Sequence, residues 1–166
     1  MSFEGALFTI AEMAIGVAGF SAIVAAFTGQ GPLTPTDRRR FVWLFTNSFV
    51  AALLAYVPVL LSEASLSETD LWRASSAFMC LVWAVAAIVW IIDEVRNKEP
   101  DAPRARGVWQ GPLALVPSFL NFLLQLSNVF GLIWEPSGAA YTAGTLVWLY
   151  VGAITFVSIV LERPGE

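Results

Sequence analysis

The chain contains no histidine, a single lysine and a single cysteine. Without histidine it cannot build an imidazole-ligated haem, a histidine-containing zinc or copper site, or a histidine general base. Lys98 lies in a charged connecting segment, so no buried lysine is available for a Schiff base. Cys80 is alone in an apolar run, which excludes an intrachain disulfide and predicts a small packing residue. We therefore expect no cofactor and no metal site.

Charge is also scarce. Charged residues make up 13% of the 166 residues, whereas a typical soluble domain has about a quarter. The formal net charge is −4, which argues against the basic patch that a nucleic-acid partner requires. Most charges fall in short connecting segments, and 57% of the residues are hydrophobic. We therefore expect one membrane domain over residues 1–166, without a linker.

Five apolar segments account for most of the chain. Crossing the hydrocarbon core of a bilayer takes about 20 residues, and a backbone in lipid must satisfy its own hydrogen bonds. The sequence therefore predicts an all-α, polytopic membrane protein with five transmembrane helices. They are expected at residues 5–28, 41–62, 74–92, 112–134 and 139–161. Glu4 and the absence of a basic residue before the first segment argue against a cleaved signal peptide.

The basic residues predict the orientation. Eight of the nine would lie on one side of the membrane, and only Arg73 on the other. The eight are Arg38, Arg39, Arg40, Arg96, Lys98, Arg104, Arg106 and Arg163. Because basic connections stay in the cytosol, we expect an external N-terminus and a cytoplasmic C-terminus. The run Arg38–Arg39–Arg40 is chiefly this topology signal, and it could also bind anionic lipid headgroups. The expected location is the cell membrane, in bacteria the inner membrane.

The first segment carries two faces of small residues. At 100° per residue, Glu12, Gly16 and Gly19 share one face. A second side, the alanine face, carries Ala11, Ala14, Ala18, Ala22 and Ala25. Small residues let helix backbones approach closely in lipid, so this helix is expected to have neighbours on two sides.

Glu12 is the candidate functional residue of this segment. A charged side chain at bilayer depth is costly and often marks an ion or proton path. Two other interpretations stand beside a transport role. Glu12 would be interfacial if the helix began near Ala11, or it could be a buried structural group that bonds to amides elsewhere in the bundle.

The fourth segment has a polar stripe of Asn121, Gln125 and Asn128, whose spacing by four and three places them on one face. Such a stripe is either interhelical hydrogen bonding or the lining of a pore. Thr142 and Thr145 lie at a similar depth in the fifth segment, as does Glu12 in the first. Pro58 and Pro117 are expected to kink the second and fourth helices.

These patterns favour two functions. The first is a homo-oligomeric channel or proton/cation conduit that uses the first helix and Glu12. The alternative is a non-transporting structural or accessory subunit that binds lipid or a partner membrane protein. We do not expect an enzyme, because the acids near the membrane boundary are mixed with basic residues, as in a solvated loop.

Overall fold

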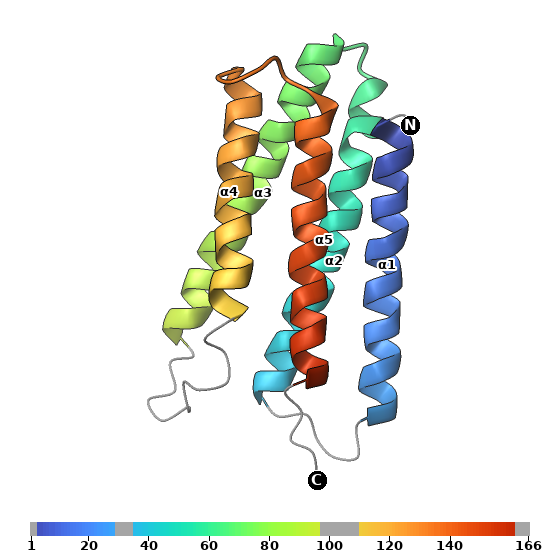
Figure 1. The fold of residues 1–166 in the computed structure, drawn as a ribbon, viewed down its shortest axis with the longest axis vertical. Helices are drawn as coiled ribbons and strands as arrows, with labels where there is room; N and C mark the ends of the chain where they lie inside the picture. Colours follow the sequence, from blue (N-terminus) through green and yellow to red (C-terminus); the bar gives the residue numbers. More distant parts are fainter. Residues whose placement is uncertain (1–2, 29–34, 97–109, 162–166) are drawn as a thin grey trace.

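The computed structural model describes residues 3–28, 35–96 and 110–161, and these residues form a bundle of five α-helices (Figure 1). The helices are α1 (Phe3–Thr28), α2 (Pro35–Ser62), α3 (Glu68–Arg96), α4 (Gln110–Phe130) and α5 (Gly138–Leu161). Each contains a stretch that is long and apolar enough to cross a membrane. The predicted all-α fold with five such helices is therefore confirmed.

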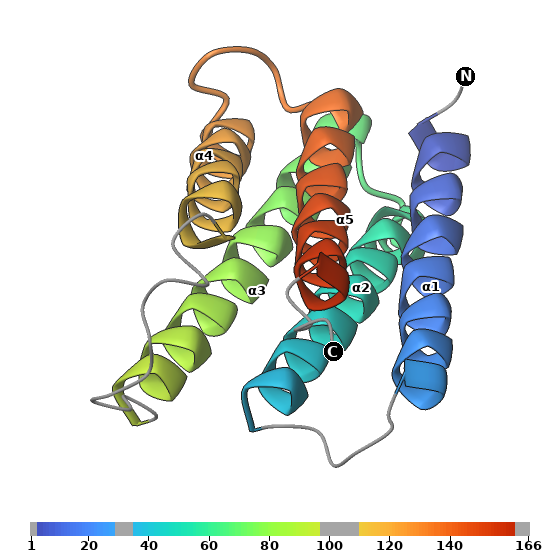
Figure 2. The same cartoon turned by 60° about the horizontal axis from the view of Figure 1, so that its bottom comes forward.

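The helices α2 and α5 form the centre of the bundle. They pack on each other, and α1 packs on both of them from one side. The pair α3 and α4 covers the other side, where α4 contacts α5 and α3 contacts both central helices (Figures 1 and 2). In the described part of the chain, α1 does not pack along α3 or α4, although Phe3 at the start of α1 contacts Trp72 of α3 edge-on, with ring centroids 5.9 Å apart. Helix α1 is therefore an edge helix of the bundle.

Basic residues lie at both ends of the bundle, but mostly at one. Arg38, Arg39 and Arg40 begin α2, and Arg96 ends α3, so these four lie at what we call the basic end. Arg73 lies near the start of α3, at the opposite end. Lys98, Arg104, Arg106 and Arg163 lie outside the described residues. Which end faces the cytosol stays a prediction.

The ends of the helices are set by local hydrogen bonds, and several differ from the expected apolar boundaries. Helix α3 begins at Glu68 instead of residue 74 because Ser67 caps it. The Ser67 hydroxyl accepts a 3.2 Å hydrogen bond from the backbone N–H of Asp70 and donates to the Asp70 carboxylate at 2.7 Å. Similarly, α2 begins at Pro35 instead of residue 41, since proline is well suited to the first turn of a helix.

Helix α4 ends at Phe130, four residues before the expected end at residue 134. Gly131 has a φ of +63°, a left-handed conformation that glycine adopts without strain. The N–H of Leu132 then donates to the carbonyl of Ser127 at 3.1 Å, which is the Schellman pattern of a helix C-terminus. The apolar run thus continues beyond the helix, into an exposed turn.

The core lies where α1, α2 and α5 meet. The alanine face of α1, with Ala11 and Ala14, is buried against the same cluster that holds Ala51 and Ala55 of α2 and Tyr141 of α5. These small side chains allow the helix backbones to approach closely, which dispersion forces favour. Of the two small faces of α1, the alanine face is therefore the one that packs inside the bundle.

Candidate functional site

Glu12 lies in the middle of a helix that could span a membrane. Helix α1 is continuous from Phe3, so it does not begin near Ala11, as the interfacial interpretation of Glu12 requires. The apolar stretch of α1 runs from Phe3 to Ile23. Glu12 lies about 14 Å from Phe3 along the helix axis, at a rise of 1.5 Å per residue. Its side chain is exposed on the outer surface of the bundle.

Gly16 and Gly19 lie on the same exposed face as Glu12. A Cβ atom added at either glycine would meet nothing within 4 Å. The space outside this face is therefore open, and packing within the bundle does not require glycine at either position. We refer to Glu12, Gly16 and Gly19 as the glycine face of α1.

Two shallow apolar grooves flank the glycine face. The α1–α2 groove encloses about 220 Å³ and lies on the side of Gly19; its lining comprises Ala14, Ile15, Ala18, Gly19, Ala22, Phe45, Ser48 and Phe49. The α1–α5 groove lies on the side of Gly16, between Met13, Gly16, Val17 and Phe20 of α1 and Phe156 of α5. Both grooves are open to the outside, so neither is an enclosed path through the bundle.

The three amides of α4 are buried together between α3 and α5, as the spacing in the sequence predicted for one face of a helix. Gln125 is at their centre. Its side-chain oxygen accepts a 2.8 Å hydrogen bond from the Ser76 hydroxyl of α3. Its amide nitrogen donates to the carbonyl of Ala140 in α5 at 2.8 Å and to the Asn121 side-chain oxygen at 3.2 Å.

The other two amides extend this amide network. The Asn121 nitrogen donates to the carbonyl of Gly144 at 3.3 Å. Asn128 donates to the Ser76 hydroxyl at 2.8 Å, and its oxygen accepts a 2.9 Å bond from the backbone N–H of Ser137. The amides therefore find their partners inside the bundle and join α3, α4 and α5 to one another, as interhelical hydrogen bonding does.

Sequence reasoning did not identify Ser76, Ser137 and Gly144, the partners of these amides. Ser137 could have been found, because a serine that follows a proline and precedes a helical run is a typical N-cap. Gly144 is identified by the lack of space for a side chain at that position. A Cβ there would lie 2.6 Å from the Asn121 oxygen and 2.8 Å from the Met79 sulfur, and it would also overlap the Gln125 nitrogen. Only glycine leaves room for the network at that position.

The two threonines of α5 do not join the network. The buried Thr145 hydroxyl donates to the carbonyl of Tyr141 in its own helix at 3.1 Å. Thr142 is half-buried, and its hydroxyl has no hydrogen-bond partner among the residues that the structure describes.

The structure does not bring Glu12 and the amide network together. Helix α1 runs parallel to α5, with Phe3 against Gly138 and Phe20 against Phe156. By that register Glu12 is level with residues 147–148 of α5, roughly 5 Å nearer the basic end than Gly144. It also lies on the outer face of a helix that does not pack on α4. Glu12 and the amides are therefore two separate sites.

The remaining candidate residues are the two prolines inside helices and the three arginines at the start of α2. Pro58 is buried inside α2, and Pro117 is half-buried inside α4. Arg38 is exposed, whereas Arg39 and Arg40 are half-exposed. Arg39 forms an ion pair with Asp93, which joins α2 to α3 at the basic end.

The glycine face can hold a proton on the Glu12 carboxyl group or pair that group with a cation. The two grooves beside this face can receive apolar side chains. Among the described residues, no group of three acidic or cysteine side chains could hold a metal ion. No protein-family model matches the chain, and no curated protein or solved structure is significantly similar to it.

Proposed function

We propose that the protein is a multi-pass protein of the cell membrane whose copies assemble around α1 into a proton or cation conduit. In this proposal the basic end faces the cytosol, and Glu12 of each copy contacts the path. The observation that carries the proposal is the position of Glu12, which is exposed in the middle of the apolar stretch of α1.

The reason is energetic. A charged side chain at the centre of a membrane helix costs about 2.5 to 3.5 kcal/mol or more. Glu12 forms no ion pair with any residue that the structure describes, and it is the only Asp, Glu, Lys or Arg between Glu4 and Asp37. Direct contact with lipid would leave this cost uncompensated. A water-filled path, a bound cation or protonation relieves it.

Symmetry supports a shared path. All copies of one chain insert with the same orientation, so a closed ring has its axis along the membrane normal. Glu12 then lies at one depth in every copy. Carboxyl groups at one depth around an axis are a common means of selecting cations or relaying protons. By contrast, the amide network already uses its hydrogen bonds inside the protomer.

Flux into liposomes tests the proposal. Purified protein would be reconstituted, and proton or potassium entry under an imposed membrane potential would be followed with a trapped dye. We expect flux from the native protein, at least a tenfold loss in Glu12→Gln, and native flux in Glu63→Gln, which changes an exposed acid outside the apolar stretches. No flux from native protein, or equal flux from Glu12→Gln, contradicts the proposal.

The second candidate is an accessory subunit that binds a different membrane protein. It is favoured by the glycine face itself, because open glycines between two apolar grooves suit a foreign helix as well as a copy of α1. In that case a basic residue of the partner would pair with Glu12. Purification in mild detergent from the native membrane would return a stoichiometric partner, and this partner would be lost from Glu12→Gln. Recovery of this chain alone argues against it.

A further inference from the structure

The α3–α4 pair is joined to the rest of the bundle near the end opposite the basic end, which we call the far end. Among the side chains that the structure describes, those of α3 that are buried lie between Trp72 and Met79, and those of α4 between Asn121 and Asn128. These stretches meet the first turns of α5, where the amide network bonds to two of its carbonyls. The amide network therefore fastens the pair to α5 at the far end.

Towards the basic end the α3–α4 pair is much less packed. None of the described side chains of residues 80–96 in α3 and 113–120 in α4 is buried. In both views, α3 lies farther from α2 at the basic end than at the far end (Figures 1 and 2). The pair is therefore held by buried contacts at one end only.

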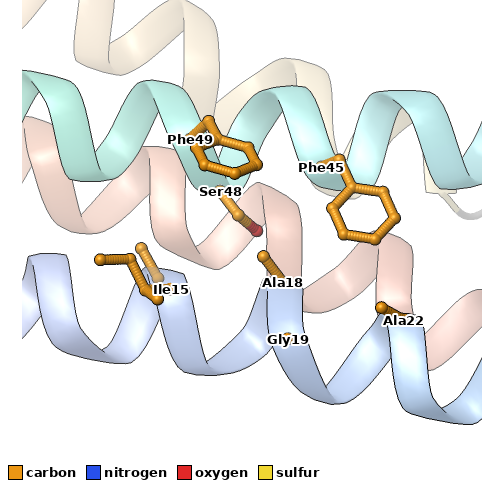
Figure 3. Close-up of a pocket in the computed structure, with 8 residues that line it drawn as sticks. Ile15, Ala18, Gly19, Ala22, Phe45, Ser48 and Phe49 are labelled. Carbon is orange, nitrogen blue, oxygen red and sulfur yellow. The ribbon is translucent and has the colours of Figure 1, made fainter.

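The other three helices stay packed at the level where α3 and α4 do not. Phe41 of α2 is buried near the basic end, in a cluster against which Phe156 of α5 packs. On the side of α1, Ala18 lies across from Ser48 of α2 (Figure 3). The loss of packing is therefore specific to the α3–α4 pair and is not a general property of this half of the bundle.

Helices α3 and α4 are also joined directly to each other. The rings of Trp83 and Phe122 stack with centroids 4.5 Å apart. At the far end, the Arg73 Nε–H donates to the carbonyl of Val129 at 3.0 Å. The hydroxyl of Ser76 adds the bonds to the amide network described above. Because these contacts lie at several levels, α3 and α4 can move as one body.

An ion pair joins this body to α2 at the basic end. Arg39 lies at the start of the apolar stretch of α2, and Asp93 lies at the end of that of α3. Their side chains form an ion pair and are 33% and 28% exposed. Ion pairs that water reaches contribute little to stability, since water and salt compete with them. This contact can therefore break at a low cost.

Trp148 of α5 supplies a force in the opposite direction. It is buried, yet its indole N–H has no hydrogen-bond partner among the residues that the structure describes. Trp148 follows Gly144 by one helical turn, and Gly144 lies against Met79, the last buried residue of α3. Trp148 is therefore on the side of α5 that faces α3, where the packing of α3 ends. A buried donor without a partner is unfavourable, and water would relieve it.

We propose that the Arg39–Asp93 ion pair is a latch on a two-state bundle. In the closed state the ion pair holds α3 against α2. In the open state the α3–α4 pair pivots at the amide network, its basic end moves away from α2, and water reaches the indole N–H of Trp148. The ion pair favours the closed state and the indole N–H favours the open state, so the charge at the basic end sets their ratio. The device does not rest on the proposed conduit.

Distances between spin labels test the proposal. In a Cys80→Ala background, the exposed Val42 of α2 and Val95 of α3 are changed to cysteine and labelled at the basic end. Leu60 of α2 and Phe130 of α4, both exposed, carry the labels of a second pair near the far end. Pulsed electron paramagnetic resonance in nanodiscs, with an excess of unlabelled protein, gives distances within one copy. We expect two populations at the basic end and one at the far end.

Substitutions should shift the two populations in opposite directions. Asp93→Asn should raise the ratio of open to closed by up to about fivefold, the effect of a partly exposed ion pair. Asp93→Arg should raise it as well, and adding Arg39→Asp should bring it back towards the native ratio. Trp148→Phe should lower the ratio, because the donor is gone. Asp70→Asn is the matched control, since Asp70 pairs with Arg73 inside α3, and it should leave the ratio unchanged.

Salt tests the latch with both native residues in place, so the result stays decisive if a variant does not fold. A rise in ionic strength should favour the longer distances at the basic end, and it should have no such effect in Asp93→Asn. Basic-end distances that ignore both salt and Asp93→Asn overturn the latch. Equal shifts at the two ends overturn the pivot at the amide network. A Trp148→Phe variant that opens the bundle overturns the role of the indole.

Discussion

The hydroxyl of Tyr141 in α5 donates a 2.6 Å hydrogen bond to the carbonyl oxygen of Leu54 in α2. Leu54 is four residues before Pro58, and proline has no N–H to donate to that carbonyl. Tyr141 therefore replaces the hydrogen bond that Pro58 removes from α2. Both side chains are buried, and the bond ties the two central helices together.

This relationship predicts a coupling between positions 58 and 141. Tyr141→Phe should lower the free energy of unfolding by about 1 kcal/mol, because the Leu54 carbonyl loses its donor. In a Pro58→Ala background the loss should be smaller, since the backbone N–H at position 58 can then serve that carbonyl. Unfolding in mixed micelles with increasing denaturing detergent measures both values. Tyr150→Phe, at an exposed position of α5, is the control, and an equal loss in both backgrounds contradicts the coupling.

Glycines on the two sides of the bundle should respond oppositely to a methyl group. Gly144→Ala should lower the thermal midpoint in detergent clearly, because a Cβ there overlaps the amide network; overpacking of this kind costs about 1 to 3 kcal/mol. Gly16→Ala meets open space, and alanine favours the helix by up to about 1 kcal/mol, so the thermal midpoint should be unchanged or higher. A similar loss from both variants would contradict the two environments described for these glycines.

Gln125 should contribute most to the amide network. Gln125→Leu keeps the approximate volume but removes the partner of Ser76 and of the Asn121 oxygen, so we expect a loss of about 1 to 3 kcal/mol in unfolding free energy. Ser118→Ala is the matched control, because that hydroxyl bonds only to the carbonyl of Ala114 in its own helix. Detergent unfolding that ranks the two variants equally would count against the network.

The orientation can be tested by labelling from outside the cell. In a Cys80→Ala background, Glu63→Cys should react with a membrane-impermeant maleimide in intact cells, because the α2–α3 connection is expected outside. Val95→Cys, near the basic end, should react only after the membrane is permeabilised. The reverse result would invert the orientation and leave the bundle itself unchanged.

The sequence predicted which segments form helices better than it predicted where each helix ends. Five apolar runs identified five helices, because length and apolar composition alone determine whether a segment can cross a membrane. The ends of the helices were less predictable. Ser67 caps α3, so that this helix begins before its apolar run. Gly131 ends α4, although the apolar run continues beyond it.

The candidate site was predictable only in part. Spacing placed Asn121, Gln125 and Asn128 on one face, but the pattern of a single helix does not encode which carbonyls the neighbouring helices present. Glu12 shows the same limit. Its face and the alanine face were both suitable for packing, and the alanine face is buried because α2 and α5 offer matching surfaces. Because the alanine face is the one that packs on α2 and α5, Glu12 points away from the bundle.

The amide network also has a consequence for biosynthesis. Asn121 and Gln125 emerge from the ribosome before Ala140 and Gly144, whose carbonyls accept their hydrogen bonds. Until α5 packs on α4, the amide nitrogens of Asn121 and Gln125 lack these acceptors, although Ser76 of α3 is already in place. A chain that ends before α5 should therefore keep these donors without their carbonyl partners, at a cost of about 1 to 3 kcal/mol for each buried group.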